Sequence, residues 1–476
     1  MLSFAPDLDP TTPGILVDCT NIVPTQKGYT ASYVGTNSSY AALATAAKNL
    51  VMLRKLDNST RMFAGTQTKI WEGAAGSWTD RSSGAYDIGT DTRWSFAQFG
   101  DKALAIAKTV ALQYSSAGAF AAVATAPKAT HMAVNAGFVM LADYDNGSSI
   151  TDGWYCSGYL DETNWTTAVT TECTKGRIVD TPGPITGLSA LGAGFVAFKQ
   201  NSMYVGSYAG APSVWNWTQV PGEVGIRNKD AAVTVGANLY FMGNDNFYVF
   251  DGSRPVPIAN GLREWFFKTE LNPAYVFNVI ATYDRPNNFI WFFYPSRTST
   301  TLDKALVFHV PTQRWGRVTI AVETAATYLS DAITWDGLGT SYSTWNDLPT
   351  TISYDSPFWT SQQETMAVIN SSHVLQTLAA IATTSSITTG TVGDPQQFST
   401  ASRVVPRFTT APTSATLSHQ YDNDYGDTWT AGPDSTLTNG KFDLMWSARW
   451  HREVMSFVGG FEMIDYKILL QPDGSE

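Results

Sequence analysis

Three short segments give the clearest indication of the fold: GFVMLAD (137–143), GFVAFKQ (194–200) and NLYFMGN (238–244). Each contains four or five consecutive apolar residues and then ends in polar ones. Strands that are buried on both faces have this pattern, whereas a strand with one face in water alternates apolar and polar residues. The sequence therefore predicts sheets that are stacked against one another.

These stretches belong to a coarse repeat, in which an apolar strand, a polar turn and an aromatic-bearing strand precede a closing aromatic residue. The closing residues are Trp78, Phe120, Trp165, Trp217 and Trp315. The first four are spaced by roughly 40 to 50 residues, the size of a four-stranded propeller blade. We expect an all-β fold, namely a β-propeller of about six or seven blades with an additional C-terminal β unit. An array of β-sandwiches is the alternative.

The composition divides the chain into three parts. Residues 1–39 are rich in Pro, Asp and Thr and predict an N-terminal arm, or a strand lent to another element. Residues 40–385 hold the blades, with a possible seventh unit that begins near residue 326. Residues 386–476 alternate apolar and polar residues again and predict the C-terminal β unit.

Helical periodicity is scarce. The best candidates are YAALATAAKNLVML (40–53) and NGLREWFFKTEL (260–271). Within the first, LVML reads equally well as a buried strand.

Charge and cysteine content exclude several classes of protein. Charged residues make up 15% and the net charge is −11, which argues against a general nucleic-acid binder because phosphates need Lys and Arg. Cys19, Cys156 and Cys173 form no CxxC pair, and free buried thiols are favoured over a Cys156–Cys173 disulfide.

The N-terminal sequence lacks the features of a signal peptide, and we expect no membrane-spanning helix.

The segment YDNDYGDTWTAG (421–432) resembles the Asp-box pattern S-x-D-x-G-x-T-W, with an aspartate in the serine position. The matching residues are Asp422, Asp424, Gly426, Thr428 and Trp429. In that motif the aspartate that corresponds to Asp424 accepts backbone N–H bonds, the glycine takes a positive φ, and the tryptophan packs beneath. A calcium loop would need a later glutamate that is missing here. We therefore expect a structural turn.

The sequence contains no signature of catalysis. Phosphate-binding loops, zinc-protease motifs and the GxSxG nucleophile elbow are absent from it, and the five His residues are scattered singly. We expect no enzymatic activity, no cofactor and no metal site.

The segment WSARWHREV (446–454) is the densest basic and aromatic part of the chain. Trp and Arg are the commonest anchors of protein interfaces, so Trp446, Arg449, Trp450 and Arg452 are candidate interface residues. A plain amphipathic strand is an equally good interpretation, and nucleic-acid binding ranks third.

Several segments together resemble one protein family. They are DLDPTTPGILVDCTNIVPTQKGY (7–29), NFYVFDGSRPVPIANGLREWF (246–266), NNFIWFFYPSRTSTTLDKALVFHVPTQRWGRV (287–318) and, near the C-terminus, 418–432, 443–454 and 461–470. This arrangement is similar to the tail-hub, or packaged-DNA stabilisation, proteins of short-tailed bacteriophages. The similarity covers most of the chain at the level of pattern, and no single motif is diagnostic.

The resemblance implies a β-propeller that acts as a structural virion protein of the tail. Members assemble as a hexamer, a six-fold ring below the dodecameric head-to-tail adaptor. The ring extends the DNA channel, helps to retain packaged DNA without binding it specifically, and carries tail fibres, spikes or a needle. An acidic wall agrees with such a channel, because a Lys-rich wall would hold DNA.

Two other functions are compatible with a propeller. One is a glycan-binding or glycan-cleaving propeller that acts as a receptor-binding tail component, whose aromatic residues would stack on sugar rings. The other is an intracellular scaffold, which WD-type repeats would mark, and this sequence lacks them.

Overall fold

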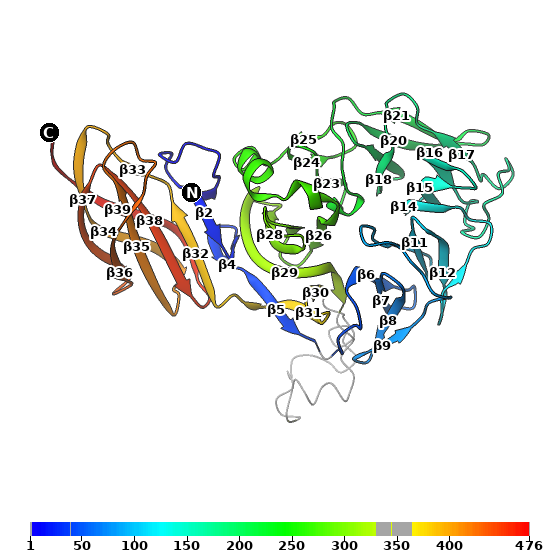
Figure 1. Cartoon of the computed structure of the whole chain (residues 1–476), viewed down its shortest axis with the longest axis horizontal. Coiled ribbons are helices and arrows are strands. Elements are labelled where there is room, and N and C mark those ends of the chain that lie inside the picture. The colour runs from blue at the N-terminus through cyan, green and yellow to red at the C-terminus, as the bar shows by residue number, and fades with distance from the viewer. Residues whose placement is uncertain (1, 39, 330–343, 345–363, 476) are drawn as a thin grey trace.

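The computed structural model describes residues 2–38, 40–329, 344 and 364–475. Within this part of the chain, strands predominate and form a ring of sheets with a separate pair of sheets beside it (Figure 1). The prediction of an all-β propeller with an additional C-terminal β unit is confirmed.

The described residues form seven blades of antiparallel strands, and in the first six blades the strands are consecutive in the sequence. The first blade contains β6 (Ala47–Arg54), β7 (Thr60–Thr66), β8 (Ile70–Ala74) and β9 (Ser77–Asp80), and the second contains β10 (Ser95–Phe99), β11 (Lys102–Ala107), β12 (Val110–Ser115) and β13 (Ala121–Ala122). The third contains β14 (Lys128–Asn135), β15 (Phe138–Asp145), β16 (Ser149–Cys156) and β17 (Lys175–Arg177), and the fourth contains β18 (Ile185–Leu191), β19 (Gly194–Lys199), β20 (Met203–Gly210) and β21 (Val214–Gln219). The fifth contains β22 (Ala232–Val235), β23 (Asn238–Met242), β24 (Phe247–Phe250) and β25 (Val256–Pro257).

The last two blades share one long strand. The sixth blade is β26 (Ile280–Asp284), β27 (Phe289–Tyr294), β28 (Leu302–His309) and the first half of β29 (Arg314–Leu329). The second half of β29 begins the seventh blade, which continues with β30 (Glu364–Asn370) and β31 (Leu375–Ile381). The predicted seventh unit therefore exists, although 330–343 and 345–363 lie outside the described residues.

The N-terminal part of the chain completes the ring. The fourth strand of the seventh blade is β5 (Tyr33–Asn37), which pairs antiparallel with β31. The seventh blade also contacts the first, because the Glu323 carboxylate accepts a hydrogen bond from the Ala47 N–H at 2.7 Å. Without β5, the outer edge of β31 would expose unpaired backbone N–H and C=O groups, and the strand donated by the N-terminus pairs with them.

The blades are held together by apolar residues on both of their faces. Every residue of β27 is buried, as is Phe138–Ala142 in β15, which agrees with the predicted burial of GFVMLAD. Aromatic rings cross the interfaces between blades, as in the Phe63–Phe120 pair (5.1 Å between centroids) and the Phe138–Trp215 pair (5.4 Å). Each such pair contributes about 0.5–1.5 kcal/mol beyond its buried area.

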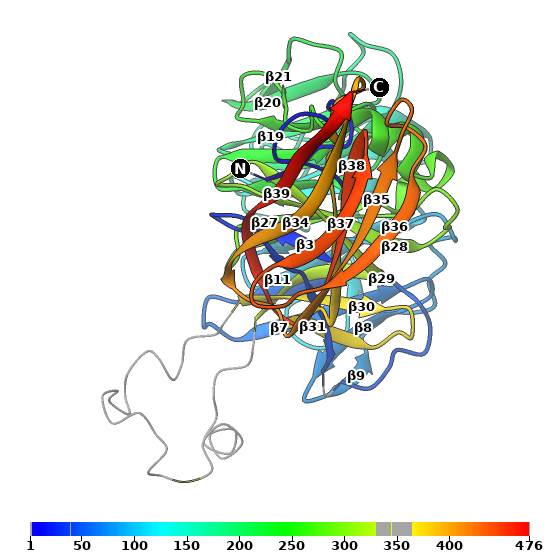
Figure 2. The ribbon, with the colours of Figure 1, turned by 90° about the vertical axis from the view of Figure 1, so that its left-hand side faces the viewer.

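The second body consists of two sheets with an apolar core between them (Figure 2). One sheet contains β1 (Ser3–Phe4), β2 (Ile15–Thr20), β32 (Thr384–Thr389), β33 (Val392–Gly393), β35 (Ser414–Asp422), β36 (Thr430–Thr436) and β38 (Trp450–Val458). The other contains β3 (Ile22–Pro24), β4 (Tyr29–Ala31), β34 (Gln397–Thr410), β37 (Phe442–Ala448) and β39 (Glu462–Ser475). We call this body the sandwich.

The N-terminal residues belong to both bodies. Strands β1 to β4 lie in the sandwich, whereas β5 lies in the propeller. At the junction, β3 pairs with the sixth-blade part of β29, where Ile22 lies opposite Arg317. The prediction of a single N-terminal arm at residues 1–39 is wrong, because its strands are divided between the two bodies, and the alternative of a strand lent to another element is confirmed by β5. The change from propeller to sandwich after β31 falls close to the expected boundary at residue 385.

The two helix candidates have different outcomes. Residues 47–54 of the first candidate form strand β6, so the helical interpretation is wrong there and the alternative of a buried strand is confirmed. The second candidate contains the short π-helix η2 (Trp265–Glu270), which lies near the 3-10 helix η3 (Pro273–Asn278). Asp7 accepts backbone N–H bonds from Glu264 (2.6 Å) and Trp265 (2.7 Å) at the start of η2, where helical N–H groups have no partner of their own.

Tyr29 provides a test of the junction. Its buried hydroxyl accepts from the Phe4 N–H at 2.9 Å and donates to the Trp315 carbonyl at 3.0 Å. We expect Tyr29→Phe to lower the free energy of unfolding by about 1–3 kcal/mol, since two buried backbone groups lose their partner.

Urea unfolding followed by tryptophan fluorescence measures this change. Tyr425→Phe is the control, because Tyr425 is 89% exposed and its loss should matter by less than about 0.5 kcal/mol. Equal stabilities of the two variants would contradict the assignment.

Candidate functional site

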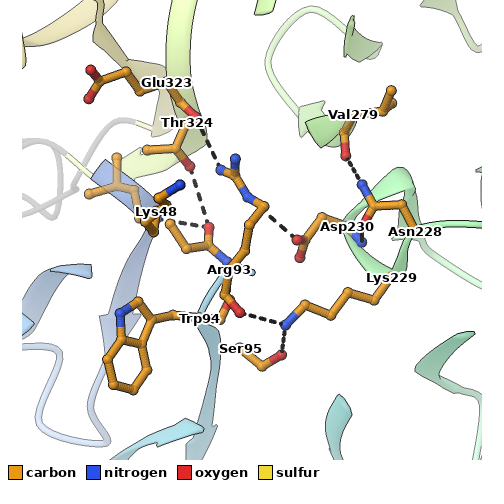
Figure 3. A network of polar contacts seen from close by, with 12 residues as sticks. Lys48, Arg93, Trp94, Ser95, Asn228, Lys229, Asp230, Val279, Glu323 and Thr324 are labelled. Atoms are coloured by element: carbon orange, nitrogen blue, oxygen red, sulfur yellow. Dashed lines mark hydrogen bonds and ion pairs between the residues drawn. The ribbon is translucent and has the colours of Figure 1, made fainter. Parts of the chain in front are cut away.

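Polar residues close to the first strands of several blades contact one another (Figure 3). We call this group the axial cluster. It consists of Lys48, Asn49, Arg93, Ser95, Asn228, Lys229, Asp230, Glu323 and Thr324. Residues that are far apart in the sequence meet here, because the ring brings together the segments around the first strands of different blades.

Lys229 connects three blades. It lies in the 3-10 turn η1 (Lys229–Ala231) just before β22, where the Asn228 side chain caps the turn by accepting from the Asp230 N–H at 3.1 Å. The Lys229 ammonium donates to the Arg93 carbonyl (3.1 Å), to the Thr130 carbonyl (3.3 Å) and to the Ser95 hydroxyl. Burial lowers the pKa of Lys229.

Arg93 extends the network across the ring. Its Nη2 donates to the Glu323 carbonyl at 3.1 Å, and its Nε lies 3.6 Å from a carboxylate oxygen of Asp230. Arg93 precedes the second blade, Asp230 the fifth, and Glu323 belongs to the seventh. A buried guanidinium needs such partners, so the cluster fixes non-neighbouring blades relative to one another.

A pocket of about 140 Å³ lies beside this network. Its walls come from the second to the sixth blades and include Lys108, His131 and Arg227 in addition to Arg93 and Lys229. Lys108 and Arg227 are exposed, whereas His131 is buried. The axial cluster therefore borders a small polar pocket whose walls combine exposed cations with a buried imidazole.

The sequence did not reveal the axial cluster. The only sequence feature that marks the cluster is a basic residue shortly before an apolar strand, as in TDTRWSF (90–96) and RNKDAAV (227–233). Single charges at strand starts are common, and only the closed ring brings these two together.

The Asp-box-like turn forms, with one difference in its capping residue. The Asp422 carboxylate accepts backbone N–H bonds from Asp424 (3.0 Å), Gly426 (2.7 Å), Asp427 (3.0 Å) and Thr428 (3.3 Å). Asp424 itself is exposed and caps nothing through its side chain among the described contacts. The expected role of Asp424 is therefore wrong, because the oxygen atoms that face the loop belong to the residue in the serine position.

The other residues of the turn behave as the motif requires. Gly426 has a φ of +79°, which a side chain would disfavour. The half-buried Trp429 ring lies 4.2 Å from the Arg452 guanidinium carbon, a cation–π contact.

The candidate interface residues lie around this turn. Arg449 Nη1 donates to the Asn423 carbonyl at 3.1 Å, and Trp450 Nε1 donates to the Asp424 carbonyl at 3.3 Å. Trp446 is 37% exposed, and its ring contacts that of Tyr421 in a tilted arrangement with 5.1 Å between centroids. These contacts show that Trp446, Arg449, Trp450 and Arg452 converge at one end of the sandwich, and their part in an interface stays a prediction.

In the described ranges, no three His, Cys, Asp or Glu side chains gather as metal ligands would. The helices found in these ranges are too short or too polar to cross a membrane. Cys19, Cys156 and Cys173 are free and buried.

Comparison with known proteins gives only distant structural matches. No family model and no curated protein matches the sequence. Among solved structures, the extracellular domain of a putative hybrid two-component system from B. thetaiotaomicron matches with a TM-score of 0.45 at 8% identity, covering 85% of this chain and 46% of the other.

Two further structures match at a similar level. The extracellular domain of a putative one-component system from B. thetaiotaomicron has a TM-score of 0.43 at 8% identity, with 80% of this chain and 43% of the other covered. PorZ, a bacterial surface component of the type-IX secretion system of Porphyromonas gingivalis, has a TM-score of 0.38 at 8% identity, with 78% and 44% covered. This chain spans less than half of these proteins, and the matches carry no inference about its function.

The turn provides a matched pair of variants. We expect Asp422→Ala to lower the free energy of unfolding by about 1–3 kcal/mol, because four backbone N–H groups lose their acceptor. Asp424→Ala should change it by less than about 0.5 kcal/mol. Chemical denaturation of both variants measures the difference, and an equal or reversed order would refute the assignment of the cap to Asp422.

His131 gives a pH dependence. Burial, and then the charge of Lys229, lower the pKa of His131 to about 3, while the unfolded chain keeps a value near 6.5. Between these values the unfolded state binds the proton and the folded state does not. Acidification below pH 6.5 should therefore destabilise the fold by up to about 1.4 kcal/mol per pH unit through this group.

Urea unfolding at pH 7 and pH 5 tests this dependence. His131→Gln removes the group, and its free energy of unfolding should fall less steeply over this range than that of the wild type. An unchanged slope would show that His131 titrates normally in the folded protein.

Proposed function

We propose that this chain is a structural protein of the tail of a short-tailed bacteriophage, a hub or nozzle below the head-to-tail adaptor. The proposal rests on the resemblance of its segments to that family. In this role the chain forms a ring of copies, extends the DNA channel and carries fibres, spikes or a needle.

One observation carries the proposal: the segments that bear the resemblance pack together as one continuous body. Residues 246–266 form the end of the fifth blade, 287–318 form most of the sixth, and 418–470 lie in the sandwich. A single apolar core contains members of each, among them Phe247, Trp315 and Met463. The similarity thus follows a physical unit, the junction of propeller and sandwich, and not isolated turns.

The outer end of the sandwich offers a surface suited to assembly. Tyr425, Met445 and Trp446 are 89%, 79% and 37% exposed. Exposed aromatic and Arg residues are typical of interface anchors. The net charge of −11 is compatible with DNA that passes without sticking.

The same surface favours a second candidate function. Tyr425, Trp446 and the nearby Tyr421 are aromatic rings at a sandwich surface, and such rings can stack on sugars. In this alternative the chain is a glycan-binding component of the tail.

Quantitative mass spectrometry of purified particles tests the proposal. The particles should come from a lysate that encodes this chain, and they should contain about six copies of it for about twelve copies of the adaptor, as a six-fold ring requires. Absence from the particles would overturn the proposal. A copy number that follows that of a fibre or spike would favour the glycan-binding alternative, which a glycan array then checks.

A further inference from the structure

The pocket beside the axial cluster has an excess of positive charge in an acidic protein. Four cationic side chains line it, and they face two carboxylates. The cations are Arg93, Lys108, Arg227 and Lys229, and the acids are Asp91 and Asp230. The excess contrasts with the net charge of −11 of the whole chain.

Two of the four cationic side chains are occupied by partners within the protein, whereas the other two are more available to a ligand. Lys229 is bonded to carbonyl and hydroxyl oxygen atoms, and Asp230 offsets the charge of Arg93. At the mouth, Arg227 uses Nε for a bond to the Asn244 side chain at 3.0 Å, which leaves its terminal nitrogen atoms available. Lys108 is exposed there. The mouth therefore presents two cationic groups to an entering anion.

Asp143 lies close enough to influence Lys108 electrostatically. However, the Asp143 carboxylate accepts a hydrogen bond from the Thr130 hydroxyl, and burial raises its pKa. It does not line the pocket, whereas Lys108 does.

Two residues of the wall carry polar atoms that lack partners. His131 lies on β14, where its Nε2 donates to the Ile185 carbonyl at 3.0 Å, so the neutral ring leaves Nδ1 as an acceptor. This Nδ1 and the Thr92 hydroxyl have no hydrogen-bond partner in the protein. Buried polar atoms of this kind are rare and usually bond to water or a ligand. An acceptor next to cations suits a ligand that has both a negative charge and an O–H group.

We propose that the axial pocket binds a small oxyanion that also carries a hydroxyl, of the class of hydrogen phosphate. Its charged oxygen atoms face Lys108 and Arg227, and its O–H group suits the acceptor on His131. The volume of about 140 Å³ admits a group of this size but not a nucleotide or an oligosaccharide. This site is independent of the proposed tail function.

Isothermal titration calorimetry of the full chain with inorganic phosphate at pH 7 tests the site. The wild type should give saturable heat. The Lys108→Gln/Arg227→Gln double variant should bind at least about tenfold more weakly, because both cations at the mouth are lost. Both residues are exposed, so the fold should persist.

Lys27→Gln is the control for the loss of an exposed cation outside the pocket. Lys27 is exposed in the turn between β3 and β4 of the sandwich, and this variant should bind phosphate as the wild type does. The absence of saturable heat with the wild type, or equal affinity of the double variant and the control, would overturn the proposal. Acetate, which has no O–H group at pH 7, should bind more weakly than phosphate, and equal affinity would refute the role given to the ligand hydroxyl.

Discussion

The pairing of the N-terminal strands with both bodies is the constraint on which the rest of the structure depends. Strand β5 completes the seventh blade, while β3 joins the sixth blade to the sandwich through β29. In a propeller each blade packs against the next, so the last blade must contact the first to close the ring. Here the outer strand of the last blade comes from the start of the chain, and its pairing with β31 joins residues that are far apart in the sequence.

The same segment explains why the two bodies share one core. Leu2, Phe4 and Tyr29 come from the N-terminal residues and pack in the cluster that contains Trp315 of the propeller and Met455 of the sandwich. Asp7 caps η2, and Arg317 bonds to Thr20 and Asp18 across the junction. Several of these contacts involve buried groups, for which loss of one partner is costly. The junction is therefore a packed interior and not a flexible linker.

The sequence predicted the parts that depend on local pattern. The buried strands, the blade size and the turn at 421–432 follow from uninterrupted apolar runs, closing aromatic residues and the positions of Asp and Gly. Trp78, Trp217 and Trp315 indeed lie in the fourth strands of their blades. Residues 40–53 were ambiguous because alanine-rich segments favour a helix locally, whereas pairing of β6 with β7 decided the outcome.

The sequence could not predict contacts that form only when the ring of blades is closed. Arg93 and Lys229 are separated along the chain by more than two blades, and their contact exists only because the ring brings blade starts together. The exchange of roles between Asp422 and Asp424 depends on the exact position at which β35 ends, because Asp422 is its last residue and Asp424 already lies in the turn.

Native-state hydrogen exchange, measured by mass spectrometry at increasing denaturant, tests the central claim that the N-terminal segment makes propeller and sandwich one cooperative body. Peptides from β27 in the propeller and β38 in the sandwich should lose protection together, with the same free energy of opening and the same dependence on denaturant. If β38 opens at lower denaturant while β27 stays protected, the bodies unfold separately and the claim is contradicted.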